Sequence, residues 1–200
     1  MPTGGRRVND TQPEQCILVQ GDAGVIKKID WIVLKEDGDS RLIISKYILD
    51  KKAYSDCREA ADWNTSSIRN WLNNEFINEA FTKTEQEKIR MAVIKNESGT
   101  AESKDTADKV FMLSREEAGS FLYDNNERLC APTEYAMPDM MVIPSENGAS
   151  NACWWLRSPG KNKNSACCVR FDGNINFIGD RGADVKRTDI GVRPVRWIRN

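Results

Sequence analysis

The sequence predicts an α+β domain in which helices pack on a small, loop-rich antiparallel sheet. Apolar side chains recur at helical spacing between residues 65 and 121, whereas Pro and Gly punctuate the chain after about residue 130 and leave only short β-prone runs. Helices early and a sheet late are typical of the α+β class. The 200 residues suit one sizeable domain better than two. We therefore expect a flexible polar segment at residues 1–14 and a single domain over residues 15–200.

The first β-prone runs lie between residues 16 and 45. Residues 16–20 (CILVQ) are short and apolar, and two further runs, 31–35 and 41–45, flank a polar turn at residues 37–39 (Asp-Gly-Asp). An Asp-Gly pair between two β-rich runs is a strong local signal for a hairpin. We therefore predict a hairpin over residues 31–45.

The longest predicted helix follows the sequence SSIRNWLNNEFINEAF. Either Asn64 or Thr65 is suited to cap its start, because a short polar side chain can accept a hydrogen bond from the first helical turn. The apolar residues at helical spacing are Ile68, Trp71, Leu72, Phe76 and Phe81. The pattern therefore predicts an amphipathic helix whose apolar side faces the core.

Two shorter helices are predicted further along the chain. One covers residues 84–91, with Thr84 as the cap and Glu87 completing a capping box. The other begins after Ser114, which has Glu117 three positions on, and it follows a short predicted strand at residues 110–113 (VFML).

The C-terminal half is predicted to be a sheet. Its β-prone runs are CWWLR at 153–157, ACCVRF at 166–171, NINFI at 174–178 and VRPVRWI at 192–198. The Asp-Gly pair at 172–173 indicates a hairpin turn between the second and third runs. We predict that residues 153–198 form one antiparallel sheet with long loops, packed on the earlier helices.

Charge and hydropathy exclude some classes of partner. The chain has 29 basic and 30 acidic residues, so it lacks the overall basic excess that phosphate binding needs, and we expect no nucleic-acid partner. No run of about 18 apolar residues exists, so we expect no membrane span. The first ten residues lack a signal-peptide pattern. The chain is therefore expected to be cytoplasmic before any display, unless a leader has been removed.

The last thirty residues are locally basic. Such a bias suits an acidic ligand, but a solvated face with a few buried Arg pairs is the simpler interpretation, and we favour it.

The reactive residue types point away from common catalytic sites. The chain has no His, which excludes Ser–His–Asp and Cys–His sites. Its six Cys form no Cys-x-x-Cys motif, so we expect no zinc site and no other cofactor. Buried thiols in a reducing compartment are the favoured interpretation, and an exported protein would permit three disulfides. We therefore predict that the protein is not an enzyme.

Two motifs carry a resemblance to known proteins: WWLRSPG at 154–160 and GVRPVRWI at 191–198. Together with the segments 31–50, 65–76 and 164–180, they resemble a bacterial and phage-associated domain family over roughly residues 28–198. The C-terminal half of that family is similar to C-type-lectin-like and formylglycine-generating-enzyme-like folds. The resemblance implies a C-type-lectin-like fold for this chain.

The same arrangement resembles the variable proteins of diversity-generating retroelements, in which a mutagenic reverse transcriptase rewrites a C-terminal segment chiefly at Asn codons. This resemblance implies a variable ligand-binding region at 155–198 and an unknown protein or surface ligand as partner. The residues expected to bind that ligand are Asn162, Asn164, Cys168, Arg170, Phe171, Asn174, Asn176, Phe177, Ile178, Asp180 and Arg181.

Other functions and simpler roles remain as alternatives. A formylglycine-generating-type oxidase uses two separated Cys, whereas Cys167 and Cys168 are adjacent; a calcium-dependent lectin uses Glu-Pro-Asn or Trp-Asn-Asp clusters, which this chain lacks. Alternate residues of the variable segment, including Phe171 and Phe177, would fill the core if the segment were only structural. Trp154 and Trp155 should face opposite sides of a strand, with one in the core and the other partly exposed or under a loop. Because Trp buries much area, we favour the interpretation that both serve packing alone. We interpret Arg157 and Arg193 as structural pins.

Overall fold

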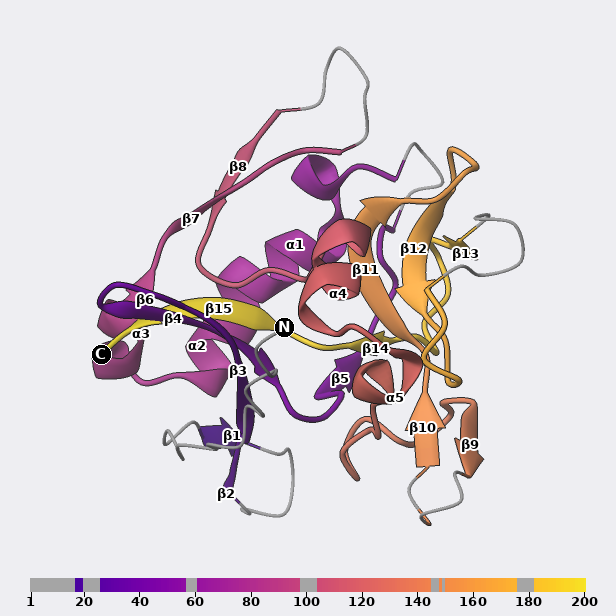
Figure 1. The fold of residues 1–200 in the computed structure, drawn as a ribbon, viewed down its shortest axis with the longest axis horizontal. Helices are drawn as coiled ribbons and strands as arrows, with labels where there is room; N and C mark the ends of the chain where they lie inside the picture. The colour runs from indigo at the N-terminus through magenta and orange to yellow at the C-terminus, as the bar shows by residue number, and fades with distance from the viewer. Residues whose placement is uncertain are drawn as a thin grey trace, which may run out of the picture.

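The computed structural model describes residues 17–19, 26–56, 61–97, 104–144, 148, 150–175 and 182–200. The predicted flexible segment at 1–14 lies outside these residues. The fold is α+β, as predicted, with small sheets and short helices (Figure 1).

A four-stranded antiparallel sheet forms one half of the molecule. Its strands, in spatial order, are β3 (Trp31–Asp37), β4 (Ser40–Ser45), β15 (Val195–Arg199) and β6 (Ile89–Arg90). The predicted hairpin is confirmed, because β3 and β4 pair from Trp31↔Ser45 to Asp37↔Ser40. Gly38 takes a φ of 61° at the turn, which glycine adopts without steric cost.

A five-stranded sheet forms the other half and carries most of the C-terminal segment. Its spatial order is β13 (Ala183–Asp184), β12 (Ser165–Val169), β11 (Trp154–Pro159), β14 (Gly191–Val192) and β5 (Asp50–Lys51). The prediction of one antiparallel sheet over 153–198 is wrong in two respects. Strands β11 and β14 pair in parallel, and β15 belongs to the other sheet. Pro194 lies at the crossing between the two sheets, where its carbonyl accepts the amide of Ser45 at 3.0 Å.

Three two-stranded ribbons complete the β structure. They are β1 (Ile17–Val19) with β2 (Ile26–Lys28), β7 (Ala92–Ile94) with β8 (Thr106–Asp108), and β9 (Val142–Pro144) with β10 (Ser150–Ala152). The predicted strand at 110–113 is reduced to a single bridge between Phe111 and Val195. This segment is still fully buried, because it lies where the two large sheets meet: Leu113 O accepts the amide of Arg157 at 2.9 Å.

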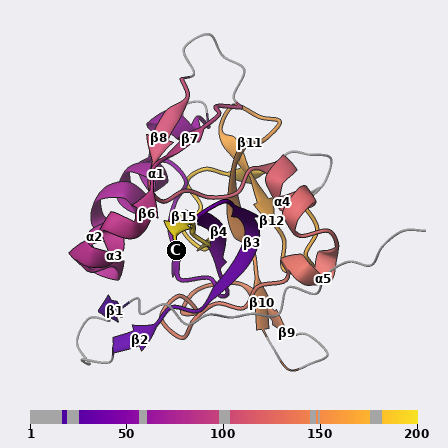
Figure 2. The ribbon, with the colours of Figure 1, turned by 60° about the vertical axis from the view of Figure 1, so that its left-hand side comes forward.

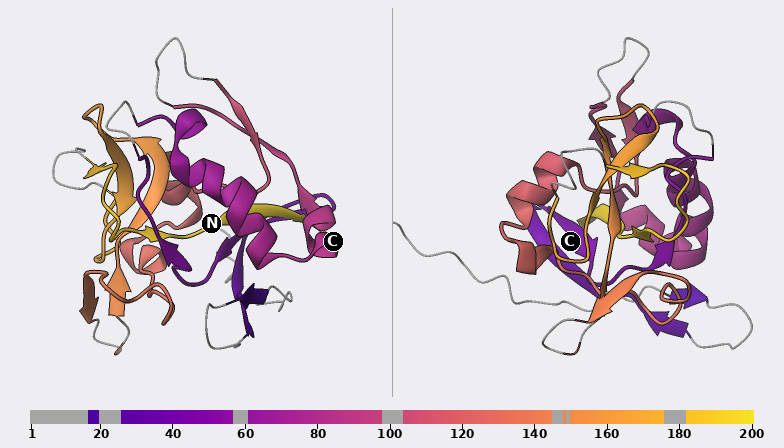
Figure 3. Two further views of the ribbon diagram at one scale, coloured as in Figure 1. Left: turned by 180° about the vertical axis from the view of Figure 1, so that it is seen from behind. Right: turned by 90° about the vertical axis from the view of Figure 1, so that its right-hand side faces the viewer.

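The helices lie on two sides of the sheets (Figure 2). On one side are η1 (Trp63–Thr65), α1 (Ser67–Trp71), the π-helical η2 (Leu72–Phe76), α2 (Ile77–Ala80) and α3 (Lys83–Lys88). The rear view shows α1, η2 and α2 as one continuous rod, and Ser66, whose backbone is extended, separates η1 from α1 (Figure 3, left). On the other side are α4 (Arg115–Phe121) and α5 (Asn125–Arg128).

The caps of these helices correct two predictions and confirm one. The long helix is capped by Ser66, not by Asn64 or Thr65, which lie in the preceding 3-10 turn. The capping box of α3 uses Thr82 and Glu85, two residues before the predicted pair. The capping box of Ser114 and Glu117 is present as predicted.

Candidate functional site

The hairpin of β11 and β12 is the scaffold from which the predicted binding residues project. The strands pair antiparallel, with Trp154 opposite Val169 and Trp155 opposite Cys168. Both tryptophans are 0% exposed, so the favoured interpretation that both are packed inside the protein is confirmed. They face opposite sides of the sheet, and each side is covered. The Trp154 indole donates to Arg128 O at 3.1 Å, and the Trp155 indole donates to Lys52 O at 2.8 Å.

Two buried arginines hold this scaffold in place, as predicted. Arg157 donates to Met112 O at 2.9 Å and to both carboxylate oxygens of Glu117, one of them at 2.9 Å. The carbonyl of Arg157 accepts the Tyr54 hydroxyl at 2.7 Å. Because a buried guanidinium needs several oxygen partners, these contacts fix the backbone of β11 against the segments on either side.

Arg193 forms the second pin. It is 1% exposed, donates from Nε to Ser45 O at 2.9 Å, and lies over the Trp154 ring at 5.0 Å from the ring centroid. Ser45 ends a strand of the four-stranded sheet, whereas Trp154 begins a strand of the five-stranded sheet. Arg193 therefore ties the two sheets together.

Hydrogen bonds fix the backbone of the turn after β12, and the side chains of this turn are exposed or half-buried. The Gly173 amide donates to Arg170 O at 2.9 Å, and the Arg170 amide donates to Asn174 O at 3.0 Å. Asp172 Oδ1 accepts the Asn174 amide at 3.1 Å. The turn predicted from Asp-Gly at 172–173 is therefore confirmed, whereas the described residues show no second strand that would make it a hairpin. Asn174 and Ile175 are not in a strand, and the rest of the predicted strand at 174–178 lies outside the described residues.

The side chains of this turn are charged, amide-bearing and aromatic. Arg170 lies 3.7 Å from Asp172 Oδ1 through its Nε atom, and its guanidinium lies over the Phe171 ring at 4.9 Å from the centroid. Asp172 is exposed, while Arg170, Phe171 and Asn174 are half-buried. Phe171 is partly buried against the hydrophobic core, and this packing stabilises the turn. We define the turn surface as Arg170, Phe171, Asp172 and Asn174.

Arg128 of α5 anchors the turn surface. Its guanidinium donates to Gly173 O at 2.8 Å, to Asn125 Oδ1 at 2.6 Å and to Leu122 O. Gly173 has a φ of 76°, and a Cβ atom built on it would lie 1.9 Å from Asn125 O. Only glycine allows this approach. The turn and α5 are therefore packed as one unit.

The loop before β12 also exposes side chains, but it lies at the other end of the strand. Lys161, Asn162 and Lys163 are exposed and Asn164 is half-buried. Backbone bonds fix the loop: Lys163 O accepts the Ala61 amide at 2.7 Å, and Asn164 O accepts the Val185 amide at 3.0 Å. The five residues of β12 separate this loop from the turn surface, a distance of roughly 15 Å at the usual rise of an extended strand.

The structure therefore divides the predicted binding residues into groups. Arg170, Phe171 and Asn174 lie together on the turn surface, whereas Asn162 and Asn164 lie at the opposite end of β12. Cys168 is 2% exposed, which contradicts its assignment to an exposed binding surface, since its side chain lies within the sheet opposite Trp155. The remaining predicted residues lie outside the described part of the chain. They are Asn176, Phe177, Ile178, Asp180 and Arg181.

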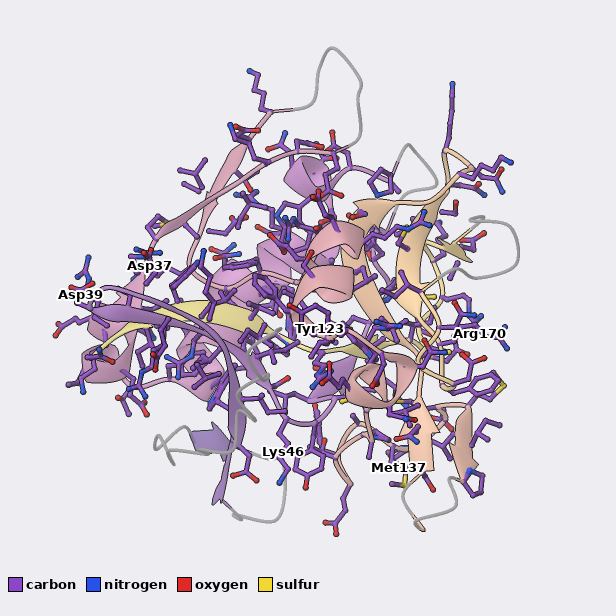
Figure 4. All side chains as sticks on the ribbon, viewed as in Figure 1. Asp37, Asp39, Lys46, Tyr123, Met137 and Arg170 are labelled. Atoms are coloured by element: carbon purple, nitrogen blue, oxygen red, sulfur yellow. The ribbon has the colours of Figure 1, made fainter. Side chains whose placement is uncertain are left out.

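Sequence reasoning missed three residues around the turn: Asp172, Arg128 and Tyr123. Tyr123, which directly precedes the cap of α5, is 81% exposed. Figure 4 shows it beside α4 and α5, with Arg170 further out towards the edge of the five-stranded sheet. Asp172 was recognisable from its Asp-Gly turn. No local pattern identifies Arg128 or Tyr123; the contact of Arg128 with the turn joins segments more than forty residues apart.

Burial shapes the acid–base behaviour of the thiols. Cys130, Cys153, Cys167 and Cys168 are free and buried. Desolvation raises the pKa of the Cys130 and Cys153 thiols above the ordinary value, and it raises the pKa of Cys168 to about 12. The thiolate, which is the reactive form, is therefore suppressed at neutral pH.

We expect the thiols of Cys130, Cys153 and Cys168 to resist thiol–disulfide exchange with an external reagent in the native protein at neutral pH. In a Cys16→Ser/Cys57→Ser background, Ellman's reagent should titrate them rapidly only after unfolding. Raising the pH above about 9 should also destabilise the fold, because the unfolded chain releases thiol protons that the folded Cys168 retains up to about pH 12. Equal labelling rates in native and unfolded protein would contradict this assignment.

Comparisons with known proteins give one family. In the described part of the chain no helix is long and apolar enough to cross a membrane. Searches of curated proteins and of solved structures found no match. A family model described as a domain of unknown function, DUF6273, matches residues 38–200. These residues include the β11–β12 scaffold, both arginine pins, α5 and the turn surface. The chain therefore belongs to the DUF6273 family.

Proposed function

We propose that this chain is a non-enzymatic ligand-binding domain with a C-type-lectin-like architecture, and that the turn surface forms part of its binding site. In this proposal the adjoining segment 176–181 supplies the ligand-binding residues that the sequence predicts after the turn. The site would work as in the variable proteins of diversity-generating retroelements, where the scaffold stays constant and the displayed side chains change.

The observation that carries this proposal is the contrast between the buried β11–β12 scaffold and the turn that follows β12. All five residues of β12 are buried and both tryptophans of β11 are 0% exposed, whereas in the turn that follows Asp172 is exposed and Arg170, Phe171 and Asn174 are half-buried. Substitutions at buried aromatic residues cost several kcal/mol, whereas exposed turn residues usually change stability by about 0.5 kcal/mol. A surface that accepts many side chains needs this combination.

The chemistry of the turn surface also suits recognition. Arg and aromatic residues are enriched where binding energy concentrates, and here Arg170 is already held against Phe171 and Asp172. Because contacts within the domain restrict the Arg170 side chain before a ligand arrives, less conformational entropy is lost on binding. The proposed site is narrower than the sequence prediction, since it omits buried Cys168 and the distant residues Asn162 and Asn164.

The burial of the cysteine thiols favours a ligand-binding function over that of a formylglycine-generating-type oxidase. Formylglycine-type oxidation needs accessible thiols, whereas Cys167 and Cys168 are buried, and burial raises the pKa of Cys168 to about 12.

A peptide-binding experiment tests the proposed function. Phage displaying random dodecapeptides are panned on the immobilised full chain, and the enriched clones are measured against a triple variant, Arg170→Ala/Asp172→Ala/Asn174→Ala. We expect the triple variant to lose at least about tenfold in affinity, or about 1.4 kcal/mol, because it removes the polar side chains of the turn surface.

The matched control is Asn162→Ala/Asn164→Ala, which removes amides of the same kind at the other end of β12. It should bind the enriched clones as the unmodified chain does. If no clone is enriched, or if enriched clones bind the triple variant at full affinity, the turn surface is not a binding site and the proposal fails.

A further inference from the structure

A cleft of about 440 Å³ lies at the tip of the first hairpin. Its walls are Glu36 of β3, Gly38 of the turn, Arg41 of β4 and Asn200, which follows β15. We call these four residues the hairpin cleft. A volume of this size lies within the range of about 300–1,000 Å³ that small-molecule sites occupy.

The hairpin cleft and the turn surface lie far apart. Figure 4 labels Asp37 and Asp39, which flank Gly38 in the hairpin turn, at one edge of the molecule and Arg170 of the turn surface at the opposite edge. The cleft belongs to the four-stranded sheet, whereas the turn surface follows β12 of the five-stranded sheet. A ligand in the cleft would therefore not contact the turn surface.

Backbone hydrogen bonds hold the walls of the cleft in place. Arg41 is paired with Glu36 on one side of β4 and with Ile198 on the other. The Asn200 amide donates to Asp39 O at 2.9 Å. Apart from its chain neighbours, nothing lies within 4 Å of a Cβ atom built on Gly38, so the cleft stays open at the turn. The cleft is therefore a preformed space with an entrance.

The two charged side chains of the cleft are opposite each other in the sheet but do not pair. Directly opposite residues of an antiparallel ladder have Cβ atoms about 4.5–5.5 Å apart on the same face, where opposite charges usually attract each other. Within the described residues, neither Glu36 nor Arg41 makes a side-chain hydrogen bond or an ion pair. Their neighbours do pair, since Arg90 lies 3.4 Å from Asp37. The cleft thus holds a cation and an anion that the protein leaves uncompensated.

Arg41 differs in this from the other arginines that the fold buries fully or in part. Its Nε atom is shielded from solvent and has no hydrogen-bond acceptor in the described structure. A guanidinium carries five N–H donors, and shielding them without acceptors is unfavourable. The arginines whose side chains do contact a carboxylate, a carbonyl or an aromatic ring are Arg69, Arg90, Arg128, Arg157, Arg170, Arg187, Arg193 and Arg196.

The charges of the cleft define the kind of ligand that fits. A guanidinium binds a carboxylate through two parallel hydrogen bonds, and a carboxylate accepts hydrogen bonds from an ammonium group. A ligand with only a negative charge is repelled by Glu36, and a ligand with only a positive charge is repelled by Arg41. A small zwitterion, whose two charges lie on one carbon atom, satisfies both side chains.

We propose that the hairpin cleft binds a free α-amino acid. The guanidinium of Arg41 donates to the α-carboxylate, and the Glu36 carboxylate accepts the N–H groups of the α-ammonium. This inference goes beyond the proposed function, because it assigns a small ligand to a different part of the molecule.

Thermal melting of the full chain with each of the proteinogenic L-amino acids tests the inference. We expect at least one of them to raise the melting temperature, by about 5–10 °C at a concentration about 100 times its Kd. Acetate and ethylamine, which each carry only one of the two charges, should leave the melting temperature unchanged.

Two charge-removing variants locate the site. Arg41→Gln and Glu36→Gln should each raise the Kd for the stabilising amino acid at least about tenfold in calorimetric titrations, because each removes one charged hydrogen-bonding partner. Both variants should fold, since neither side chain bonds to the rest of the described structure. The matched control is Arg199→Gln, which removes an exposed arginine opposite Ser40, on the other face of the ladder, and should leave the Kd unchanged.

Three results would overturn the inference. They are a melting temperature that no amino acid raises, stabilisation by acetate or ethylamine as large as by any amino acid, and an unchanged Kd in both Arg41→Gln and Glu36→Gln. Each would leave the proposed function standing, because the peptide experiment on the turn surface does not involve the hairpin cleft.

Discussion

Replacing Trp155 with Ala is expected to lower the free energy of unfolding by about 3–5 kcal/mol. The side chain is 0% exposed, packs edge-on against Tyr54 with a ring-centroid distance of 5.7 Å, and donates to Lys52 O. Its removal leaves a cavity in the five-stranded sheet and an unpaired carbonyl. Urea unfolding, followed by tryptophan fluorescence and circular dichroism, measures the change.

The control for Trp155→Ala is Tyr123→Ala, which truncates an aromatic residue that is 81% exposed. Its free energy of unfolding should stay within about 0.5 kcal/mol of the unmodified chain. Equal destabilisation by the two substitutions would mean that the β11–β12 hairpin is not the stabilising scaffold described above.

Two glycine substitutions should change stability in opposite directions. Gly173→Ala places a Cβ atom 1.9 Å from Asn125 O at a residue whose φ is 76°, so strain and the forced separation of the turn from α5 should cost at least about 2 kcal/mol. Gly119→Ala lies in α4 with nothing within 4 Å of the added Cβ, and it should stabilise the protein by about 0.4–1 kcal/mol.

Thermal melting of these two variants measures both effects. A melting temperature for Gly173→Ala at or above that of the unmodified chain would show that the turn does not pack against α5. Both variants add one methyl group, but at residues that differ in backbone conformation and in neighbouring atoms. A similar shift of the melting temperature in both variants would therefore indicate a general effect of the added methyl group, not the packing of this turn.

Local sequence signals predicted local structure well. The Asp-Gly pairs at 37–38 of the first hairpin and at 172–173 of the turn both mark real turns, because positive φ is available to glycine. The capping box at Ser114 is also real, because the side chains of Ser114 and Glu117 accept each other's backbone amides. The capping box of α3 was placed two residues late, since both Thr82–Glu85 and Thr84–Glu87 have the required spacing and only packing decides between them.

Long-range arrangement could not be read from the sequence. The run 192–198 has a continuous β-prone pattern, yet Pro194 divides it between two sheets, and nothing local specifies which sheet each half joins. Likewise, adjacent Trp154 and Trp155 face opposite sides of a strand, but the sequence does not say that segments from residues 52 and 128 cover both sides.

The candidate site shows the same limit. Sequence reasoning identified Arg170 and Asn174 at the turn, but it combined them with Asn162 and Asn164, which the length of β12 places at the other end of the strand. It also missed α5, whose contact with the turn depends on Arg128 and on the missing side chain of Gly173. Spatial neighbours from distant segments leave no periodic pattern in a single chain.

The most direct test of the central claim, that a pinned scaffold carries a substitution-tolerant turn surface, is the thermal melting of the Arg170→Ala/Asp172→Ala/Asn174→Ala variant beside Trp155→Ala. For a domain of this size each kcal/mol shifts the melting temperature by about 2–4 °C. We predict that the triple variant melts within about 5 °C of the unmodified chain, whereas Trp155→Ala melts about 6–20 °C lower. A triple variant that melts as early as Trp155→Ala would show that the turn is part of the structural core, and the proposed binding surface would be wrong.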